Sequence, residues 1–219
     1  TIKEKHITDV LIGLHHLSEE KNFLGATAER IVKRIYETIF IYKPVQPVNT
    51  LTRLVVAIPP KAELEPGFAH WYYKLATLAK EAGLSIAFYG NGYTINELKD
   101  QQRLLKMAVP VTYSVFNNWD DFLALSGELK QYDLFVIITS RKGHVSYSNS
   151  LEKLSYYLSN YFLSNSFLHI YPSQLEQGLK MDNIQHTDST LADTFTEQVQ
   201  VLSQPGNWLR ELFKRKKAE

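Results

Sequence analysis

Two segments of the sequence follow the same plan, and this repeat constrains the fold more than any other feature. The first opens with the apolar run Asp9-Val-Leu-Ile-Gly13, continues through a loop and a helical pattern, and closes with an apolar run that stops at Pro44. The second opens with Asp133-Leu-Phe-Val-Ile137 and closes with an apolar run that stops at Pro172. Self-similarity of this kind indicates duplicated units. We therefore expect two related strand–helix–strand segments in one chain.

Strand patterns alternate with helical patterns along most of the sequence, which predicts an α/β fold with a parallel open sheet. Apolar runs predict strands at residues 9–13, 39–42, 54–58, 85–89, 109–116, 133–139 and 167–171. Helical spacing and capping residues predict helices at about 26–38, from Pro66-Gly67 to a stop at Gly83, at 94–107, from 118 onward, and at 151–162. A strand, a helix and a strand cannot enclose a core by themselves, so the first segment must dock on the second unit or on another chain.

The repeat also predicts how the chain is divided. We expect residues 1–44 to be the closing half of a first unit, 45–50 a linker, 51–172 a complete second unit, and 173–219 a tail with short helices near 189–203 and 205–217. Both closing strands, 39–42 and 167–171, are apolar and end at a proline, and exposed apolar edges favour aggregation. These strands are therefore expected to be paired rather than left as free edges.

Composition and motifs argue against several function classes. The 24 basic residues nearly balance the 23 acidic ones, and no basic stripe interleaves with the aromatic residues, so nucleic-acid binding has little support. The chain has no cysteine, and its seven histidines show no ligand spacing, so no metal site is predicted. Nucleophile elbows, Walker loops and GxGxxG motifs are missing from the sequence, and we expect no enzymatic activity.

The loop after the first strand resembles the nucleotide-binding loop of universal stress proteins, Gly-x2-Gly-x9-Gly-Ser/Thr. Gly13 matches the first glycine, Gly25 and Thr27 match the end of the motif, and His16 stands where the second glycine belongs. The spacing to Gly25 is one residue short, and Ala26 precedes the hydroxyl residue. The resemblance implies an adenine nucleotide as a candidate ligand of Gly13, His16, Gly25 and Thr27, although no cofactor is expected for the chain as a whole. It also implies that the closing strands 39–42 and 167–171 lie side by side and antiparallel, because the final strands of stress-protein units usually pair in this way.

The second copy departs further from the same family. Its first strand ends at Ile58-Pro59-Pro60, where stress proteins usually place an aspartate that holds adenine or ribose. Its fourth strand is followed by Ser140, Arg141 and Lys142 in place of the glycine series. These three residues are candidates for binding an anion or a partner carboxylate through charge-assisted hydrogen bonds. The alternative is an ordinary solvated charged loop.

The chain also resembles the cytosolic C-terminal region of bacterial cation:proton antiporters that carry tandem stress-protein-like domains. The resemblance rests on a combination of segments between residues 7 and 172, which are DVLIGLHH, QPVNTLTR, VVAIPP, EPGF, WDDF and YDLFVI. It implies a non-catalytic regulatory or sensory domain at the cytoplasmic face of the inner membrane, with the transmembrane part of the same polypeptide as partner. A homodimer and a nucleotide are further partners to be considered. The alternative function is a free-standing universal stress protein that binds an adenine nucleotide.

Overall fold

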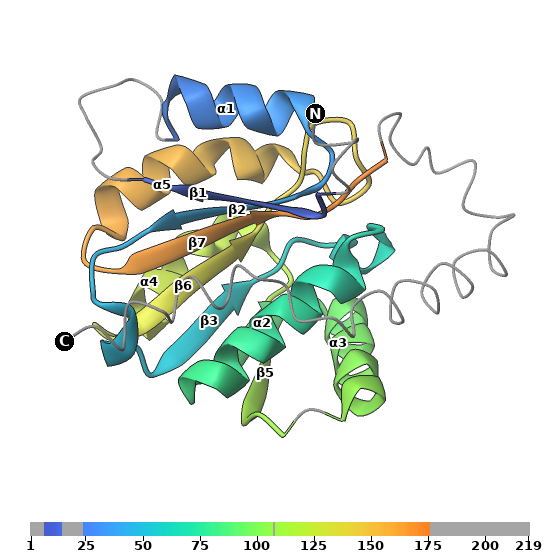
Figure 1. The fold of residues 1–219 in the computed structure, drawn as a ribbon, viewed down its shortest axis with the longest axis vertical. Coiled ribbons are helices and arrows are strands. Elements are labelled where there is room, and N and C mark those ends of the chain that lie inside the picture. The colour runs from blue at the N-terminus through green and yellow to red at the C-terminus, as the bar shows by residue number, and fades with distance from the viewer. Residues whose placement is uncertain (1–6, 15–23, 107, 176–219) are drawn as a thin grey trace, which may run out of the picture. The chain divides into compact units, whose positions relative to one another are not determined.

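The computed structural model describes residues 7–14, 24–106 and 108–175, all within the compact unit Thr1–Lys180. Its centre is one seven-stranded sheet with the order β1-β2-β7-β6-β3-β4-β5 (Figure 1). The strands are β1 (Asp9–Gly13), β2 (Thr38–Lys43), β3 (Arg53–Ala57), β4 (Ser85–Gly90), β5 (Val111–Val115), β6 (Asp133–Ile138) and β7 (Ser166–Tyr171). All neighbouring pairs are parallel except β2 with β7. The predicted α/β fold with an open, mostly parallel sheet is confirmed.

Helices cover both faces of this sheet. The helical elements are α1 (Gly25–Arg34), η1 (Val48–Thr50), η2 (Ala62–Leu64), α2 (Phe68–Ala82), α3 (Gly92–Leu105), η3 (Trp119–Ala124), α4 (Leu125–Glu128), η4 (Asn149–Lys153) and α5 (Leu154–Tyr161). Apolar residues of α1, η3, α4, η4 and α5 pack on one face, and α2 and α3 lie on the other (Figure 1). None of the helices in the described ranges combines the length and the hydrophobicity that a membrane-spanning segment needs.

Strands β2 and β7 join the two copies, and their arrangement confirms the predicted antiparallel pair. Ile41 lies opposite His169 in this ladder, and Ile39 lies opposite Tyr171. The first strand–helix–strand segment, β1-α1-β2, is thereby continuous with the sheet of residues 51–172. The finer division into 1–44, 45–50, 51–172 and 173–219 stays a prediction.

Contacts around this pair repeat about the Ile41–His169 position. Thr38 and Ser166, three residues before that pair, are the first residues of β2 and β7. The Ser166 hydroxyl accepts a hydrogen bond from the Val45 backbone N–H (2.9 Å), and the Thr38 hydroxyl accepts one from the Ser173 N–H (3.2 Å). Val45 and Ser173 directly follow the prolines that end the two strands. The two copies are therefore related by an approximate two-fold axis between β2 and β7.

Four predicted helices differ from the observed ones, and one of them, expected at 151–162, is the 3₁₀ segment η4 followed by α5. The helix expected to reach residue 38 ends at Arg34, because Ile35 turns to an extended conformation while its N–H bonds the Ile31 carbonyl. The helix expected at 94–107 begins at Gly92, where the Asn91 side chain caps it by accepting from the Thr94 N–H. The helix expected after residue 118 is the 3₁₀ segment η3 followed by the single turn α4.

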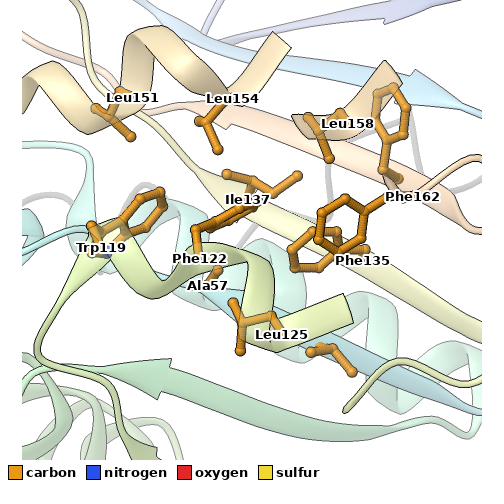
Figure 2. Packing of buried hydrophobic residues seen from close by; sticks show 12 residues of the cluster. Ala57, Trp119, Phe122, Leu125, Phe135, Ile137, Leu151, Leu154, Leu158 and Phe162 are labelled. Carbon is orange, nitrogen blue, oxygen red and sulfur yellow. The ribbon is translucent and has the colours of Figure 1, made fainter. Parts of the chain in front are cut away.

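A dense apolar cluster holds α4, η4 and α5 against the centre of the sheet. Phe122 and Phe162 lie beside Phe135 of β6, and Leu154 and Leu158 of α5 lie above (Figure 2). Ring centroids of Phe135 and Phe162 are 5.0 Å apart. This cluster fixes the loops at the carboxyl ends of β3 and β6, where an open parallel sheet usually binds its ligand. The predicted tail helices at 189–203 and 205–217 lie outside the described residues.

Candidate functional site

The candidate site lies at the carboxyl ends of β3 and β6, where the order of the strands reverses. From β3 the chain proceeds to β4 on one side, and from β6 it proceeds to β7 on the other. In sheets of this type the two diverging loops leave a crevice for a ligand. The loops in this chain are residues 58–67 and 139–148, so the question is whether they leave such a space.

Trp119 occupies the end of β3. Its indole Nε1 donates a hydrogen bond of 2.9 Å to the carbonyl of Ile58, and both residues are buried. The ring stacks on Phe122, with centroids 5.3 Å apart, and lies near Ala57 and Ile137 at the ends of β3 and β6 (Figure 2). The carbonyl and the apolar surface at the end of β3 are therefore already taken by a side chain of the protein itself.

Glu65 ties the two loops together. Its carboxylate is buried and accepts two hydrogen bonds from Ser146, one from the backbone N–H (3.1 Å) and one from the hydroxyl (2.6 Å). Hydrogen bonds to a charged acceptor are among the stronger ones in proteins, and burial makes them harder to replace by water. The crevice between β3 and β6 is thus crossed by a protein contact that a ligand would have to break.

Arg141, a predicted site residue, forms a buried connection between the two copies. Its Nε donates to the Val32 carbonyl in the last turn of α1 (3.1 Å), and its Nη2 donates to the Glu37 carbonyl (2.9 Å). Its Nη1 donates to the Pro172 carbonyl (2.6 Å) and to Gln174 Oε1 (3.0 Å). Burial lowers the pKa of the Arg141 guanidinium to about 10, so the group stays charged at neutral pH. These acceptors are backbone and amide oxygens of the protein, and the interpretation of this residue as part of a solvated loop is wrong.

The neighbours of Arg141 have different surroundings. Ser140 is buried, and its hydroxyl accepts a hydrogen bond from Gln174 Nε2 (2.9 Å). The Lys142 side chain is 82% exposed, and its ammonium group lies 3.5 Å from the exposed carboxylate of Glu152. Of the three predicted residues of the second copy, only Lys142 presents an accessible charge.

The predicted residues of the first copy lie elsewhere. Gly13 ends β1, Gly25 begins α1 with a positive φ of 75°, and Thr27 is exposed in the first turn of α1. His16 lies outside the described residues. Because β2 runs antiparallel to β7, the carboxyl ends of β1 and β6 point to opposite ends of the sheet. The structure therefore does not bring the first group of residues together with Ser140, Arg141 and Lys142, and a nucleotide at either group stays a prediction.

A second polar contact between the copies was not predicted from the sequence. Asp9 of β1 lies 2.5 Å from His70 Nε2 and 2.9 Å from Lys74 Nζ, both on α2. Burial by itself raises the pKa of the Asp9 carboxyl, but its hydrogen bonds and charge interactions with His70 and Lys74 outweigh this effect and hold the pKa below its usual value. The helical spacing of residues 70 and 74 places them on one face of α2, but no sequence pattern indicates an aspartate of the first copy as their partner.

Metal binding finds no matching group of side chains in the described ranges. No cluster of three or more histidine and carboxylate side chains there is placed to hold a metal ion. Glu65, Ser146 and Trp119 were also missed by the sequence reasoning, because their partners lie 61 to 81 residues away along the chain. In the structure, Trp119 covers the end of β3, and the hydrogen bonds between Glu65 and Ser146 fix the loops after β3 and β6.

Comparisons with known proteins add a likeness of fold only. No protein-family model and no curated protein matches the chain. Among solved structures, a universal stress protein from Archaeoglobus fulgidus matches with 14% identity and a TM-score of 0.49, covering 80% of this chain and 64% of that one. A functionally unknown protein from Pseudomonas aeruginosa matches with 11% identity and a TM-score of 0.45, covering 88% of this chain and 70% of that one. At such identities and scores, these structures carry no argument about what the chain does.

Proposed function

We propose that this chain is a non-catalytic regulatory domain of a membrane cation:proton antiporter, with the transmembrane part of the same polypeptide as its partner. The observation that carries the non-catalytic part is the occupied carboxyl end of β3, where Trp119 bonds the Ile58 carbonyl and Glu65 joins the two loops. The antiporter assignment is supported by the combination of sequence segments between residues 7 and 172. Under this proposal, the domain lies at the cytoplasmic face of the inner membrane.

Regulation by such a domain requires that a change at one end reaches the other. Three contacts support this part of the proposal, because they link the first copy to the second at separate points. They are the β2–β7 ladder, the buried Arg141 guanidinium and the ion pair of Asp9 with Lys74. Because of these contacts, a displacement of β1-α1-β2 would also displace α2 and the loop after β6.

A nucleotide-binding experiment tests the non-catalytic part. Titration calorimetry with ATP, ADP and AMP is expected to show no binding at the end of β3, and product analysis is expected to show no ATP hydrolysis. Trp119→Phe is the informative variant, because it removes the hydrogen bond to the Ile58 carbonyl and keeps an aromatic ring. ATP binding that shifts the amide resonances of residues 58–60 and 140–144 would instead support the alternative, a stress protein that binds an adenine nucleotide.

A transport experiment tests whether the partner of this domain is the transmembrane part of an antiporter. The reading frame that encodes these residues is expected to encode hydrophobic segments as well, and the complete polypeptide is expected to exchange a monovalent cation for protons in membrane vesicles. Removal of residues 1–219 from it should change the dependence of transport on pH or ion concentration while leaving exchange itself. A frame without such segments, or transport unaffected by the deletion, would contradict the antiporter assignment.

A further inference from the structure

A small cavity lies between the sheet and the segment η4–α5, on the side of the second copy away from β3. Its volume is about 140 Å³. His169 and Tyr171 of β7 and Thr139 after β6 line it from the sheet, and Leu151 and Leu154 line it from the helical segment. Glu152 and Tyr147 also border it, and the exposed Glu152 carboxylate lies at its solvent side. Nothing in the proposed regulatory function uses this space.

The sheet side of the cavity carries an unsatisfied polar group. Thr139 is 3% exposed, and its hydroxyl forms no hydrogen bond of ordinary geometry with the described residues. A longer contact with the Tyr171 phenol lowers the pKa of that phenol, against the larger rise that burial causes. Because a buried hydroxyl without a partner is costly, a ligand that bonds Thr139 would gain more than the same bond gives at the surface.

The interior of the cavity carries no charge at neutral pH. Burial lowers the pKa of His169 to about 3, so its imidazole is neutral, and burial raises the pKa of Tyr171, so its phenol keeps its proton. The Glu152 carboxylate already has the Tyr147 hydroxyl and the Lys142 ammonium group as partners. A charged ligand would therefore lose its hydration without meeting an opposite charge inside.

We propose that this cavity binds a small uncharged molecule of roughly six to nine non-hydrogen atoms that carries an amide or an equivalent adjacent donor and acceptor. Its polar end bonds the Thr139 hydroxyl, and its apolar part contacts Leu151 and Leu154. The size follows from the volume, since a cavity of about 150 Å³ accepts a benzene ring. The proposal does not rest on the regulatory function, and either one can fail without the other.

Three probes with the same ring test the chemistry. Benzamide, benzoate and benzylamine differ in charge at the polar end and are otherwise alike. Benzamide is expected to bind with a dissociation constant on the order of 1 mM, seen as shifts of the Thr139, Ser155 and Tyr171 amide resonances. Benzoate and benzylamine should bind at least about ten-fold more weakly, because each would bring an unpaired charge into the cavity. Failure of benzamide to bind, equal binding of a charged probe, or shifts confined to other residues would overturn the proposal.

Two variants locate the site. Thr139→Val removes the hydroxyl with little change of shape and should weaken benzamide binding about three- to ten-fold. Thr112→Val makes the same change on the exposed surface of β5, and its affinity should equal that of the original protein. Ser155→Trp, at an exposed position that borders the cavity, should abolish binding by filling the space while leaving the thermal transition in place. Unchanged affinity in both Thr139→Val and Ser155→Trp would place the probe elsewhere and reject the site.

Discussion

The two strand–helix–strand segments share a sequence plan, yet the structure gives them very different surroundings. All six residues of β6 are buried, because β3 and β7 flank the strand and helices cover both of its faces. β1 has no fully buried residue, and Leu11 at its centre is 45% exposed. The same local pattern therefore yields a core strand in one copy and an outer strand of the described sheet in the other. The first copy depends on the second for its stability, through a small number of contacts that can be removed singly.

Removing Arg141 is expected to have the largest effect on this dependence. Arg141→Met keeps much of the side-chain volume but leaves the Val32, Glu37 and Pro172 carbonyls without their charged donor. We expect the free energy of unfolding to fall by about 3 to 5 kcal/mol, since several buried acceptors lose a partner at once. Urea denaturation measures the change, and hydrogen exchange should become fastest in α1 and β2.

Lys142→Met is the matched control for that variant. The Lys142 side chain is 82% exposed, so its removal should change stability by no more than about 0.5 kcal/mol. Equal effects of the two substitutions would mean that Arg141 does not hold the copies together.

Substitution of His169, which lies on the two-fold axis, is expected to give the second largest effect on the free energy of unfolding, and only at acid pH. Ile41 of β2 faces His169 of β7, so only the second copy carries a titratable group there. The imidazole pKa is 6.5 as the ordinary value and about 3 in the folded protein, because burial disfavours the charged form. The unfolded chain therefore binds more protons between these values, and stability that is complete above about pH 6.5 is lost as the pH falls.

At pH 5 this linkage is expected to cost about 2 kcal/mol relative to pH 7. His169→Leu should remove most of that difference in urea denaturation at the two pH values. His144 also has a pKa lowered by burial, but it is only partly buried, so His144→Leu should change the difference less. A pH dependence that survives in the His169 variant would show that the imidazole is solvated in the folded state.

Removal of the Ser166 or the Thr38 hydroxyl, which the two-fold axis relates to each other, is expected to give the smallest loss of stability. The two variants test how closely the copies match. The Ser166 hydroxyl accepts from two N–H groups, those of Val45 and Gln46, each at 2.9 Å, whereas the Thr38 hydroxyl accepts from the Ser173 N–H alone at 3.2 Å. Ser166→Ala should therefore lower the unfolding free energy by about 1 to 2 kcal/mol, and Thr38→Val by about 1 kcal/mol or less. A larger loss in the Thr38 variant would reverse the assigned order of the two contacts.

The sequence predicted the parts of this fold that depend on local pattern. Each predicted strand appears within two residues at either end. The antiparallel β2–β7 pair was implied by the resemblance to stress proteins, and the two apolar runs that both end at proline identified the strands concerned. The end of α1 was missed because Ile35 continues the apolar spacing although it belongs to the turn before β2. Residues 119–128 have a helical composition, but packing of Trp119 and Phe122 on the sheet favours a 3₁₀ segment.

The candidate site was harder to predict, because its contacts join distant parts of the chain. The sequence placed Arg141 on a charged loop, and nothing near it indicated that carbonyls of residues 32 and 37 would bind it. The missing aspartate at Ile58 indicated a degenerate site, but the sequence did not show that Trp119 would take its place. Residue type and spacing predict where strands end and loops begin. Which residue a buried side chain will bond depends on how distant segments meet in the folded sheet.

Because β2 and β7 belong to one polypeptide, their pairing does not depend on the protein concentration. Two strands on separate molecules meet at a rate that falls with dilution, whereas β2 is tethered to the second copy by the short segment that leads from Pro44 to β3. A short tether of this kind provides an effective concentration on the order of millimolar, whatever the amount of protein in solution. The midpoint of unfolding should then stay constant when the protein is diluted, as it does not for an assembly of two chains. In this respect each chain behaves as a dimer that cannot dissociate.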